Sequence, residues 1–416
     1  MKAFKKKSSL HEQNFSSDTM LLNKLTQLFW AMLIVSIAVM PKLSNILLLC
    51  LLIISYPSYK NYHSTLSGLK QPAFILLVLT IFFWTCQGFI SGNISETKYG
   101  LFPLLLVIPI LAFFSAELKS LQLGFIIGGY LAAIRAFGGW LYFHFQNDSI
   151  DLFEGENINQ MLGMERPYLG FLLVIAGICC LWIWREKNKI IYLASFLFFL
   201  GTTAFFSARI SFITFLLVAA LFIWQTWKLS FIKKTTLVLS VVSLLLFIMS
   251  QNENLKKRLF LNSSVEQSIA NFKHHEPRVI IWACAYQIAK SSDFALFWGI
   301  PSEQEIDEKL SACYSTMENQ HRANYFKSEK LNVHSQFIAV YLTSGIIGLF
   351  LWLMFWSFLF LKSKKDILHI CLGLSLLLFC IFEVLLRRQI GSYLFALTIT
   401  LILISIATIN APSKQN

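Results

Sequence analysis

The sequence predicts an all-α membrane protein: a polytopic bundle of about twelve transmembrane helices, with a large, partly helical loop between the ninth and the tenth. Composition predicts the class, because 56% of the 416 residues are hydrophobic and only 14% are charged, whereas soluble domains carry roughly 25% charged residues. The mean hydropathy of +0.62 agrees. The apolar residues also form blocks of about 15 to 25 residues, long enough to cross a bilayer core of roughly 30 Å.

Twelve apolar segments fit this description: 22–40, 43–57, 72–92, 100–115, 121–143, 167–184, 190–206, 208–227, 235–250, 333–361, 367–386 and 391–409. The tenth is unusually long. Alternate loops such as "ELKS", "REKNK" and "KSKKD" are basic, while loops of the other set, such as "GNISETKY", are neutral or acidic. Since basic loops remain in the cytoplasm, the even number of crossings places both termini inside.

The domain organisation follows from this orientation. We expect cytoplasmic tails at 1–21 and 410–416, transmembrane spans at 22–250 and 333–409, and an outer domain at 251–332. The polar N-terminal stretch is expected to be a tail rather than a signal peptide. The net charge of +13 comes largely from loop lysines, so membrane topology explains it and we predict no binding of nucleic acid.

The outer segment is predicted to be an ordered domain, because its ten lysines and arginines balance ten acidic residues. Val279, Trp282 and Tyr286 recur at helical spacing. Pro277 suits the first turn of that helix, and Glu276 suits its positive N-terminal end. Six of the eight cysteines lie in apolar spans and are expected to act as small hydrophobic residues. Two cysteines of the outer segment can pair if it faces an oxidising space, Cys284 and Cys313.

Several arginines lie where the orientation rule does not expect positive charge, at or near the outer face: Arg135, Arg166, Arg209, Arg278, Arg387 and Arg388. A charge at membrane depth costs at least about 2.5 to 3.5 kcal/mol, so it is rarely idle. Structural explanations remain open for some of them. Arg387 is four residues from Glu383 and can form an ion pair within a helix. Arg135 can snorkel outward or pair inside the bundle, and Arg166 can anchor a helix at the headgroups.

A set of outward arginines favours an anionic ligand, because the planar guanidinium group matches phosphate oxygens. A lipid pyrophosphate would lie at this level with its tail in the bilayer. Outside the cytoplasm no ATP is present, so a group to be transferred must arrive already activated. A sugar attached to a lipid pyrophosphate meets that requirement.

His334 stands at the start of the tenth apolar segment and is predicted to be the general base that activates an acceptor hydroxyl. We place it in the first turn of the span, where the positive helix end disfavours the imidazolium form. Arginines can neutralise the leaving pyrophosphate, so the prediction uses no metal and no cofactor. The acidic stretch "EQEIDEK" is expected to be a solvated surface, as are the remaining outer histidines, His274, His275 and His321.

Three local patterns in this order resemble the bacterial O-antigen ligase and O-antigen polymerase family. They are "SARISF" around Arg209; "RVIIW", an Arg-x-x-x-Trp pattern beginning at Arg278, followed by the turn in "SSDFALFWGIPSEQ"; and "HSQFIAVYLTSGIIGLFLWL", in which His334 precedes a Gly-x-x-Gly span. The twelve-span layout with its outer loop is also similar. The chain departs from the family at Ser335, where asparagine is frequent, and at Trp298-Gly299, where two glycines are common.

The resemblance implies a metal-independent, inverting glycosyltransferase that takes a glycan from undecaprenyl pyrophosphate at the periplasmic face of the bacterial inner membrane. It implies that Arg209 and Arg278 bind the lipid pyrophosphate and that His334 serves the acceptor; Arg166 and Arg388 are further candidates for substrate binding. The expected partners are the lipid-linked glycan, an acceptor and membrane lipid.

The acceptor remains open at this stage. A lipid A core would make the protein a ligase, another lipid-linked glycan would make it a polymerase, and a protein acceptor is a third alternative. A twelve-span transporter is the alternative from another class, although no two-fold repeat of the transporter type is evident and the charged residues gather at one face.

Overall fold

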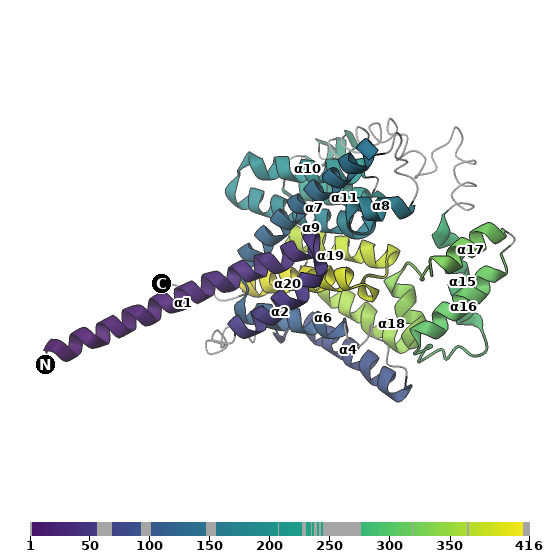
Figure 1. Ribbon diagram of the computed structural model, residues 1–416, viewed down its shortest axis with the longest axis horizontal. Helices are drawn as coiled ribbons and strands as arrows, with labels where there is room; N and C mark the ends of the chain where they lie inside the picture. The colour runs from purple at the N-terminus through teal and green to yellow at the C-terminus, as the bar shows by residue number, and fades with distance from the viewer. Residues whose placement is uncertain are drawn as a thin grey trace.

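The computed structural model describes residues 2–55, 69–92, 101–146, 155–206, 208–226, 276–317, 319–363 and 366–410, with scattered positions between 230 and 243. Within these ranges every regular element is a helix, which confirms the all-α class (Figure 1). Most of the predicted ninth span, 235–250, lies outside the described residues. The same holds for 251–275, the first part of the predicted outer domain, which includes His274 and His275.

Eleven helices overlap the other predicted spans: α1 Lys2–Val39, α2 Pro41–Ile54, α4 Pro72–Ile90, α6 Phe102–Ser115, α7 Leu118–Gln146, α9 Arg166–Lys187, α10 Ile190–Phe205, α11 Arg209–Thr226, α18 Gln336–Ser363, α19 Ile367–Phe382 and α20 Gln389–Asn410. Helix α1 also covers most of the predicted tail at 1–21. Seven of these described helices are long and apolar enough to cross a membrane, and the other four are shorter apolar helices. The chain is therefore a multi-pass membrane protein. Two short elements connect spans, α8 Gly155–Leu162 and the 3₁₀ turn η2 Leu385–Arg387.

Helices α9 and α20 form the centre of the bundle. In each, 89% of the most apolar stretch is buried by other parts of the protein, against 33% in α11 and in α18. Helix α9 packs against α7, α10, α11 and α19, and α20 packs against α6. The outer helices keep large apolar side chains exposed, as expected for surfaces that face lipid.

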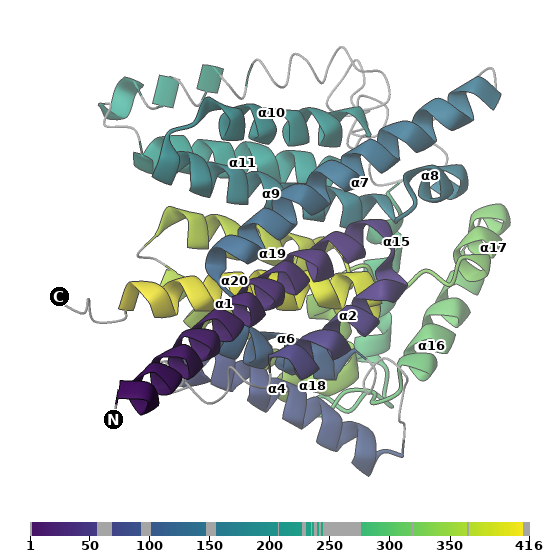
Figure 2. The same cartoon turned by 60° about the vertical axis from the view of Figure 1, so that its left-hand side comes forward.

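A small helical domain lies at one end of the bundle and consists of α15 Pro277–Lys290, α16 Glu303–Ser315 and α17 Gln320–Ser328 (Figures 1 and 2). Both chain termini lie at the opposite end of the bundle (Figure 1). The domain has its own buried core, which includes Ile281, Tyr314 and Phe326. A disulfide between Cys284 and Cys313 joins α15 to α16, with their Cα atoms 5.8 Å apart. The pairing that the sequence left open is therefore present.

Helix α18 explains the length of the tenth predicted span, because it is two helical segments divided at Gly345. This residue has φ 61° and ψ −159°, a conformation that only glycine adopts readily. The break frees the carbonyl groups of Leu342 and Thr343 and the amides of Ile346 and Ile347, which an intact helix would pair with one another. Buried backbone groups need partners, so something must fill the gap.

The loop between α15 and α16 fills it. Ile300 N donates to Leu342 O at 2.7 Å, and Ile346 N donates to Leu296 O at 3.0 Å. Gln87 of α4 donates to Thr343 O at 2.9 Å. Gly299, with φ +69°, lies against the break so closely that a Cβ atom there would come within 2.6 Å of three backbone atoms of α18. The small domain is thus attached to the first segment of α18, which begins two residues after His334.

Candidate active site

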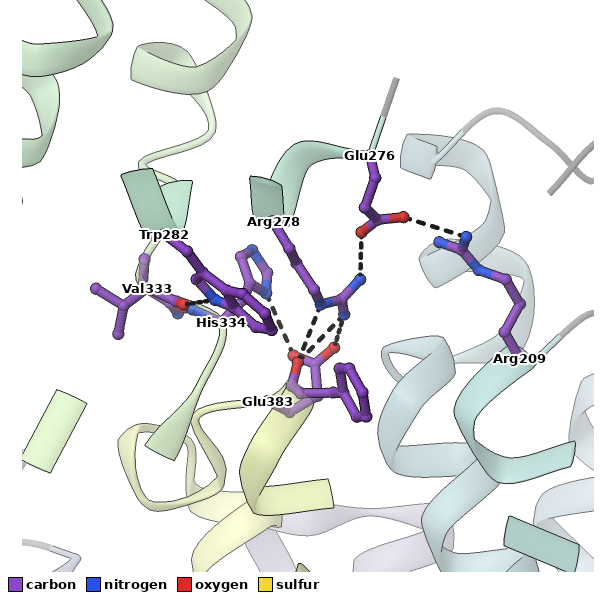
Figure 3. Close-up of polar contacts among 9 residues, drawn as sticks. Arg209, Glu276, Arg278, Trp282, Val333, His334 and Glu383 are labelled. Carbon is purple, nitrogen blue, oxygen red and sulfur yellow. Dashed lines mark hydrogen bonds and ion pairs between the residues drawn. The ribbon is translucent and has the colours of Figure 1, made fainter. Parts of the chain in front are cut away.

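Five charged or titratable side chains form a continuous chain of contacts where the small domain meets the bundle (Figure 3). Arg209 opens α11, and its Nη1 lies 3.2 Å from Glu276 Oε2. Arg278 Nη1 donates to Glu276 Oε1 at 2.8 Å, and its Nη2 donates to Glu383 Oε1 at 2.6 Å. His334 Nδ1 lies 3.3 Å from Glu383 Oε2. We call this set, Arg209, Glu276, Arg278, Glu383 and His334, the charge cluster.

Helix α15 holds together the two segments that carry His334 and Glu383. The helix begins as predicted, with Pro277 in its first turn directly after Glu276. Arg278 and Trp282 are one turn apart and so lie on the same face. Arg278 donates from Nε and Nη2 to Phe382 O, both at 3.2 Å, and Trp282 Nε1 donates to Val333 O at 3.0 Å (Figure 3). The Arg-x-x-x-Trp pattern therefore has a structural role.

His334 does not lie in the first turn of the span, and that prediction is wrong. Helix α18 begins at Gln336, and His334 precedes it with φ 44°, an uncommon conformation for a residue other than glycine. The Asn332 side chain stabilises this turn by accepting a hydrogen bond from His334 N at 2.9 Å. Backbone strain of this kind tends to occur at functional sites.

Glu383, rather than the helix end, orients the imidazole. Helix α19 stops at Phe382, and Glu383 continues in extended conformation with φ −142° and ψ 151°. A carboxylate can only accept hydrogen bonds, so in the neutral ring Nδ1 carries the proton and Nε2 carries the lone pair. The His334 side chain is 24% exposed, so part of the ring can be reached by a ligand.

The arginines of the charge cluster stabilise the ionised form of Glu276. Burial by itself raises the pKa of Glu276, but Arg209 and Arg278 outweigh it and hold the pKa below its ordinary value. Arg322 of α17 also lies within electrostatic range of Glu276. With Arg322 near Glu276, this part of the protein has three guanidinium groups against two carboxylates, Glu276 and Glu383, a balance that favours an incoming anion.

Arg166 and Arg388, the other predicted binding residues, lie at a second contact beside the cluster. Arg388 Nη2 is 3.5 Å from Glu165 Oε1, and its side chain is 59% exposed. Arg166 follows Glu165 as the first residue of α9 and is buried, which contradicts a role as a headgroup anchor. Tyr168 lies within electrostatic range of Glu165, Glu383 and Arg388, so the two groups of charges are neighbours.

Two structural explanations offered for other residues are wrong. Arg387 does not pair with Glu383, because α19 ends before Glu383 and the helical spacing between them is lost. Arg387 instead binds Asp307 with both terminal nitrogens and lies 3.8 Å from Glu303. Part of "EQEIDEK" is thus an interface between α16 and the bundle rather than a solvated surface.

Arg135 forms a hydrogen bond to a backbone carbonyl of another helix. Its Nη1 donates to Val39 O at 2.8 Å, at the last residue of α1. The contact is exposed, so Arg135 pairs with another helix at the surface of the bundle and not in its interior. In the part of the chain that the structure describes, no three His, Cys, Asp or Glu side chains form a group that could hold a metal ion.

Three residues of the site were not predicted: Glu276, Glu383 and Arg322. Glu276 was interpreted only as a helix-end residue, and Glu383 only as a partner of Arg387. A carboxylate beside a membrane span carries the same cost as an arginine there. The cost of placing a carboxylate beside a membrane span therefore identifies Glu383 as a candidate site residue. Arg322 lies in a polar helix, where a charged side chain has no such cost, so nothing in the sequence marks it as a candidate.

Comparison with known proteins gives one family. The family described as O-antigen ligase matches residues 162–353, from the end of α8 into α18. The match includes four of the predicted site residues: Arg166, Arg209, Arg278 and His334. It ends before Glu383 and Arg388. No curated protein matches the chain.

Proposed function

The chain belongs to the O-antigen ligase family, and from this premise we propose that it moves a glycan from undecaprenyl pyrophosphate to an acceptor hydroxyl at the periplasmic face of the bacterial inner membrane. The charge cluster is the observation that carries the proposal. It places Arg209 and Arg278, which can bind an anion, close to His334. The contact of His334 Nδ1 with Glu383 leaves the other ring nitrogen, Nε2, to accept a proton.

In this proposal Arg209 and Arg278 bind the pyrophosphate of the donor. Glu276 lies between them in the position that an anion would take, so the phosphate oxygens replace its carboxylate oxygens as the arginines' partners. Arg322 adds positive charge on the side of the small domain. Arg166 and Arg388 extend the positive surroundings toward α9 and α20.

His334 then acts as the general base. Its Nε2 takes the proton of the acceptor hydroxyl, and the hydroxyl oxygen forms a bond to the anomeric carbon. The bond from that carbon to the pyrophosphate oxygen breaks on the opposite face, so the configuration inverts. The leaving pyrophosphate keeps the electron pair, and the arginines stabilise its charge. Glu383 stabilises the imidazolium that forms, and the step requires no metal ion.

The proposed topology has twelve spans, cytoplasmic tails at 1–21 and 410–416, and a periplasmic domain at 251–332. The lysine-rich loops support this orientation. The disulfide between Cys284 and Cys313 supports it independently, because disulfides persist in oxidising compartments. A cysteine introduced at the exposed Glu305 should react with an impermeant thiol reagent in intact spheroplasts. Reaction only after the membrane is opened would contradict the orientation.

We propose a lipid A core as the acceptor, which makes the protein a ligase. A polymerase would use the same cluster and another lipid-linked glycan, so the chemistry is shared. The purified protein, reconstituted in vesicles with lipid-linked glycan, can be offered either acceptor. Transfer to the lipid A core alone supports a ligase, and chain extension alone supports a polymerase.

The decisive test of the transfer mechanism is His334→Ala. Loss of a general base lowers rates by about 10²- to 10⁴-fold, so the variant should transfer glycan far more slowly. Donor binding should persist, because the arginines remain, and EDTA should leave the wild type unaffected. His144→Ala is the matched control, since His144 is exposed at the end of α7. Transfer by His334→Ala at the wild-type rate would exclude His334 as the base.

A further inference from the structure

The loop between α15 and α16 exposes large apolar side chains, although α16 and α17 of the same small domain are polar helices. Four consecutive exposed residues form its tip, which we call the apolar loop: Ala295, Leu296, Phe297 and Trp298. The last three are 47%, 59% and 54% exposed. Large apolar side chains that are gathered in one exposed patch indicate an interaction surface, whereas single ones do not.

The apolar loop lies against the two membrane helices α4 and α18. The ring of Phe83 in α4 stacks on Trp298 with ring centroids 5.8 Å apart, and Ile346 N in α18 donates to Leu296 O at 3.0 Å. Beside these contacts each helix has a row of exposed apolar side chains at helical spacing: Ile75, Leu79, Phe82 and Phe89 on α4, and Ile346, Phe350 and Leu353 on α18. The apolar loop therefore continues the surface that these helices turn toward lipid.

The lengths of the two helices place the apolar loop within the hydrocarbon layer. From Gly345 to its end at Ser363, α18 runs for about 27 Å at a rise of about 1.5 Å per residue. On α4 the contacts of the loop lie about 17 to 23 Å from the start of the helix at Pro72. The hydrocarbon core is roughly 30 Å thick, and both lengths are measured from the predicted cytoplasmic ends. The two helices independently place the loop in the outer half of the core.

The backbone of the apolar loop also suits surroundings without water, because all four of its carbonyl groups accept hydrogen bonds from the protein. Ala295 O accepts from two amides of its own turn, at 3.0 and 2.6 Å. The next two carbonyls accept from successive amides of α18, at 3.0 and 3.4 Å, and Trp298 O accepts from the Gln87 side chain of α4. Backbone polar groups that face hydrocarbon require partners within the protein, whereas a loop in water can use the solvent.

We propose that the apolar loop is a membrane anchor of the small domain, inserted into the outer leaflet so that Leu296, Phe297 and Trp298 contact lipid acyl chains. Tryptophan is suited to this boundary because its ring is amphipathic. The loop follows α15, so its insertion holds the small domain, and Arg278 with it, at the membrane surface. The identity of the leaflet rests on the proposed topology, but the contact with acyl chains does not depend on the proposed glycan transfer.

Photochemical cross-linking tests the contact directly. The residue p-benzoylphenylalanine, which bonds to neighbouring C–H groups under light, is incorporated in place of Phe297 in the full-length protein. The protein is reconstituted in vesicles of phosphatidylethanolamine and phosphatidylglycerol and irradiated, and intact mass gives the fraction that carries a phospholipid. The same replacement at Phe82 of α4, which is 65% exposed, is the positive control, and at Tyr325 of α17, which is 46% exposed, the matched control in the small domain.

The yield of phospholipid adduct at Phe297 should approach that at Phe82 and exceed that at Tyr325 by at least about tenfold, because acyl chains should reach only the first two. Leu296 provides a second position, for which the same result is expected. Adducts at Phe297 and Leu296 no more frequent than at Tyr325, in a preparation where Phe82 reacts, would overturn the anchor. A covalent dimer instead of a lipid adduct at Phe297 would also overturn it, because a second copy of the chain would then cover the loop. Cross-linking uses no glycan substrate, so failure of the proposed transfer would leave this result unchanged.

Discussion

Helix α19 carries an arginine-binding carboxylate at each end, and the two ends are built differently. At its start, Asp366 accepts hydrogen bonds from Arg185 of α9, with Nη1 to Oδ1 at 2.9 Å and Nη2 to Oδ2 at 2.7 Å. At its other end, Glu383 is shared between Arg278 and His334. One end is a closed pair, and the other belongs to a longer chain of charges.

The difference distinguishes a structural contact from the proposed binding site. In the Arg185–Asp366 pair, both carboxylate oxygens and both terminal nitrogens are matched, so the geometry joins α9 to α19 and leaves little for a ligand. In the charge cluster, Glu276 divides its two oxygens between Arg209 and Arg278, and Arg322 adds a further charge. In the proposed mechanism an entering anion takes the place of Glu276 as the partner of Arg209 and Arg278.

The largest contrast between the two ends should follow from replacing arginine by lysine. Arg209→Lys and Arg278→Lys keep the charge but lose the planar set of donors. Each variant loses charge-assisted hydrogen bonds worth about 1.5 to 3 kcal/mol, so kcat/KM for glycan transfer should fall roughly 10- to 150-fold. The measurement is initial rate against concentration of the lipid-linked donor.

Arg185→Lys is the matched control, because it makes the same change at the closed pair. It should lower thermal stability slightly and leave donor kinetics unchanged. Full activity in both Arg209→Lys and Arg278→Lys, at normal protein levels, would show that these arginines do not bind phosphate through paired donors.

A smaller effect should come from the contact between the small domain and α18. In Gly299→Ala, the new Cβ meets backbone atoms of α18 at 2.6 Å and the residue keeps a positive φ, so the loop and the first segment of α18 must separate. Misplacement of a catalytic group by about 1 Å can lower a rate about 100-fold. The loop and the helix each move by part of the required distance, so His334 is displaced by less than about 1 Å. We therefore expect kcat to fall about tenfold, with binding of the donor retained.

Gly201→Ala is the control for that experiment, since nothing lies within 4 Å of the corresponding Cβ position in α10. The readout that separates positioning from simple loss of stability is the pH profile of kcat, measured on folded protein. A Gly299→Ala enzyme with wild-type kcat would show that His334 is placed independently of this contact.

Hydropathy could predict most of the described membrane helices to within a few residues, because burial in lipid requires long apolar segments. It did not predict the N-terminal extension of α1, which begins at Lys2, because that part of the helix is polar. The outward arginines were also recognisable, since charge at membrane depth is costly. The division of α18 was not predictable in this way, because Gly345 lies in an uninterrupted apolar run. The carboxylates were missed for another reason: Glu276 and Glu383 are 107 positions apart in sequence, and only the folded chain brings them to the same arginine.

The smallest expected effect concerns Glu276 and pH. Its pKa is lowered in the folded protein, since Arg209 and Arg278 outweigh burial. A carboxyl group with a lowered pKa contributes stability above its unfolded pKa, about 4.3 for glutamate, and that contribution is lost as the pH falls through the folded value. The wild type should therefore lose thermal stability between neutral pH and about pH 3, partly through Glu276.

Glu276→Gln keeps the shape of the side chain and removes its titration, so it isolates this contribution. The variant should be less stable than the wild type at pH 7, because two arginines lose their shared anion. It should lose less stability than the wild type on acidification, so that the two curves of melting temperature against pH converge at low pH. Asp366→Asn is the positive control at the closed end of α19: Arg185 outweighs burial and lowers the pKa of Asp366 as well, so its curve should converge with that of the wild type in the same way. Parallel curves for wild type and Glu276→Gln would mean that Glu276 does not carry the charge that bridges Arg209 and Arg278, and that the cluster accepts anions in some other way.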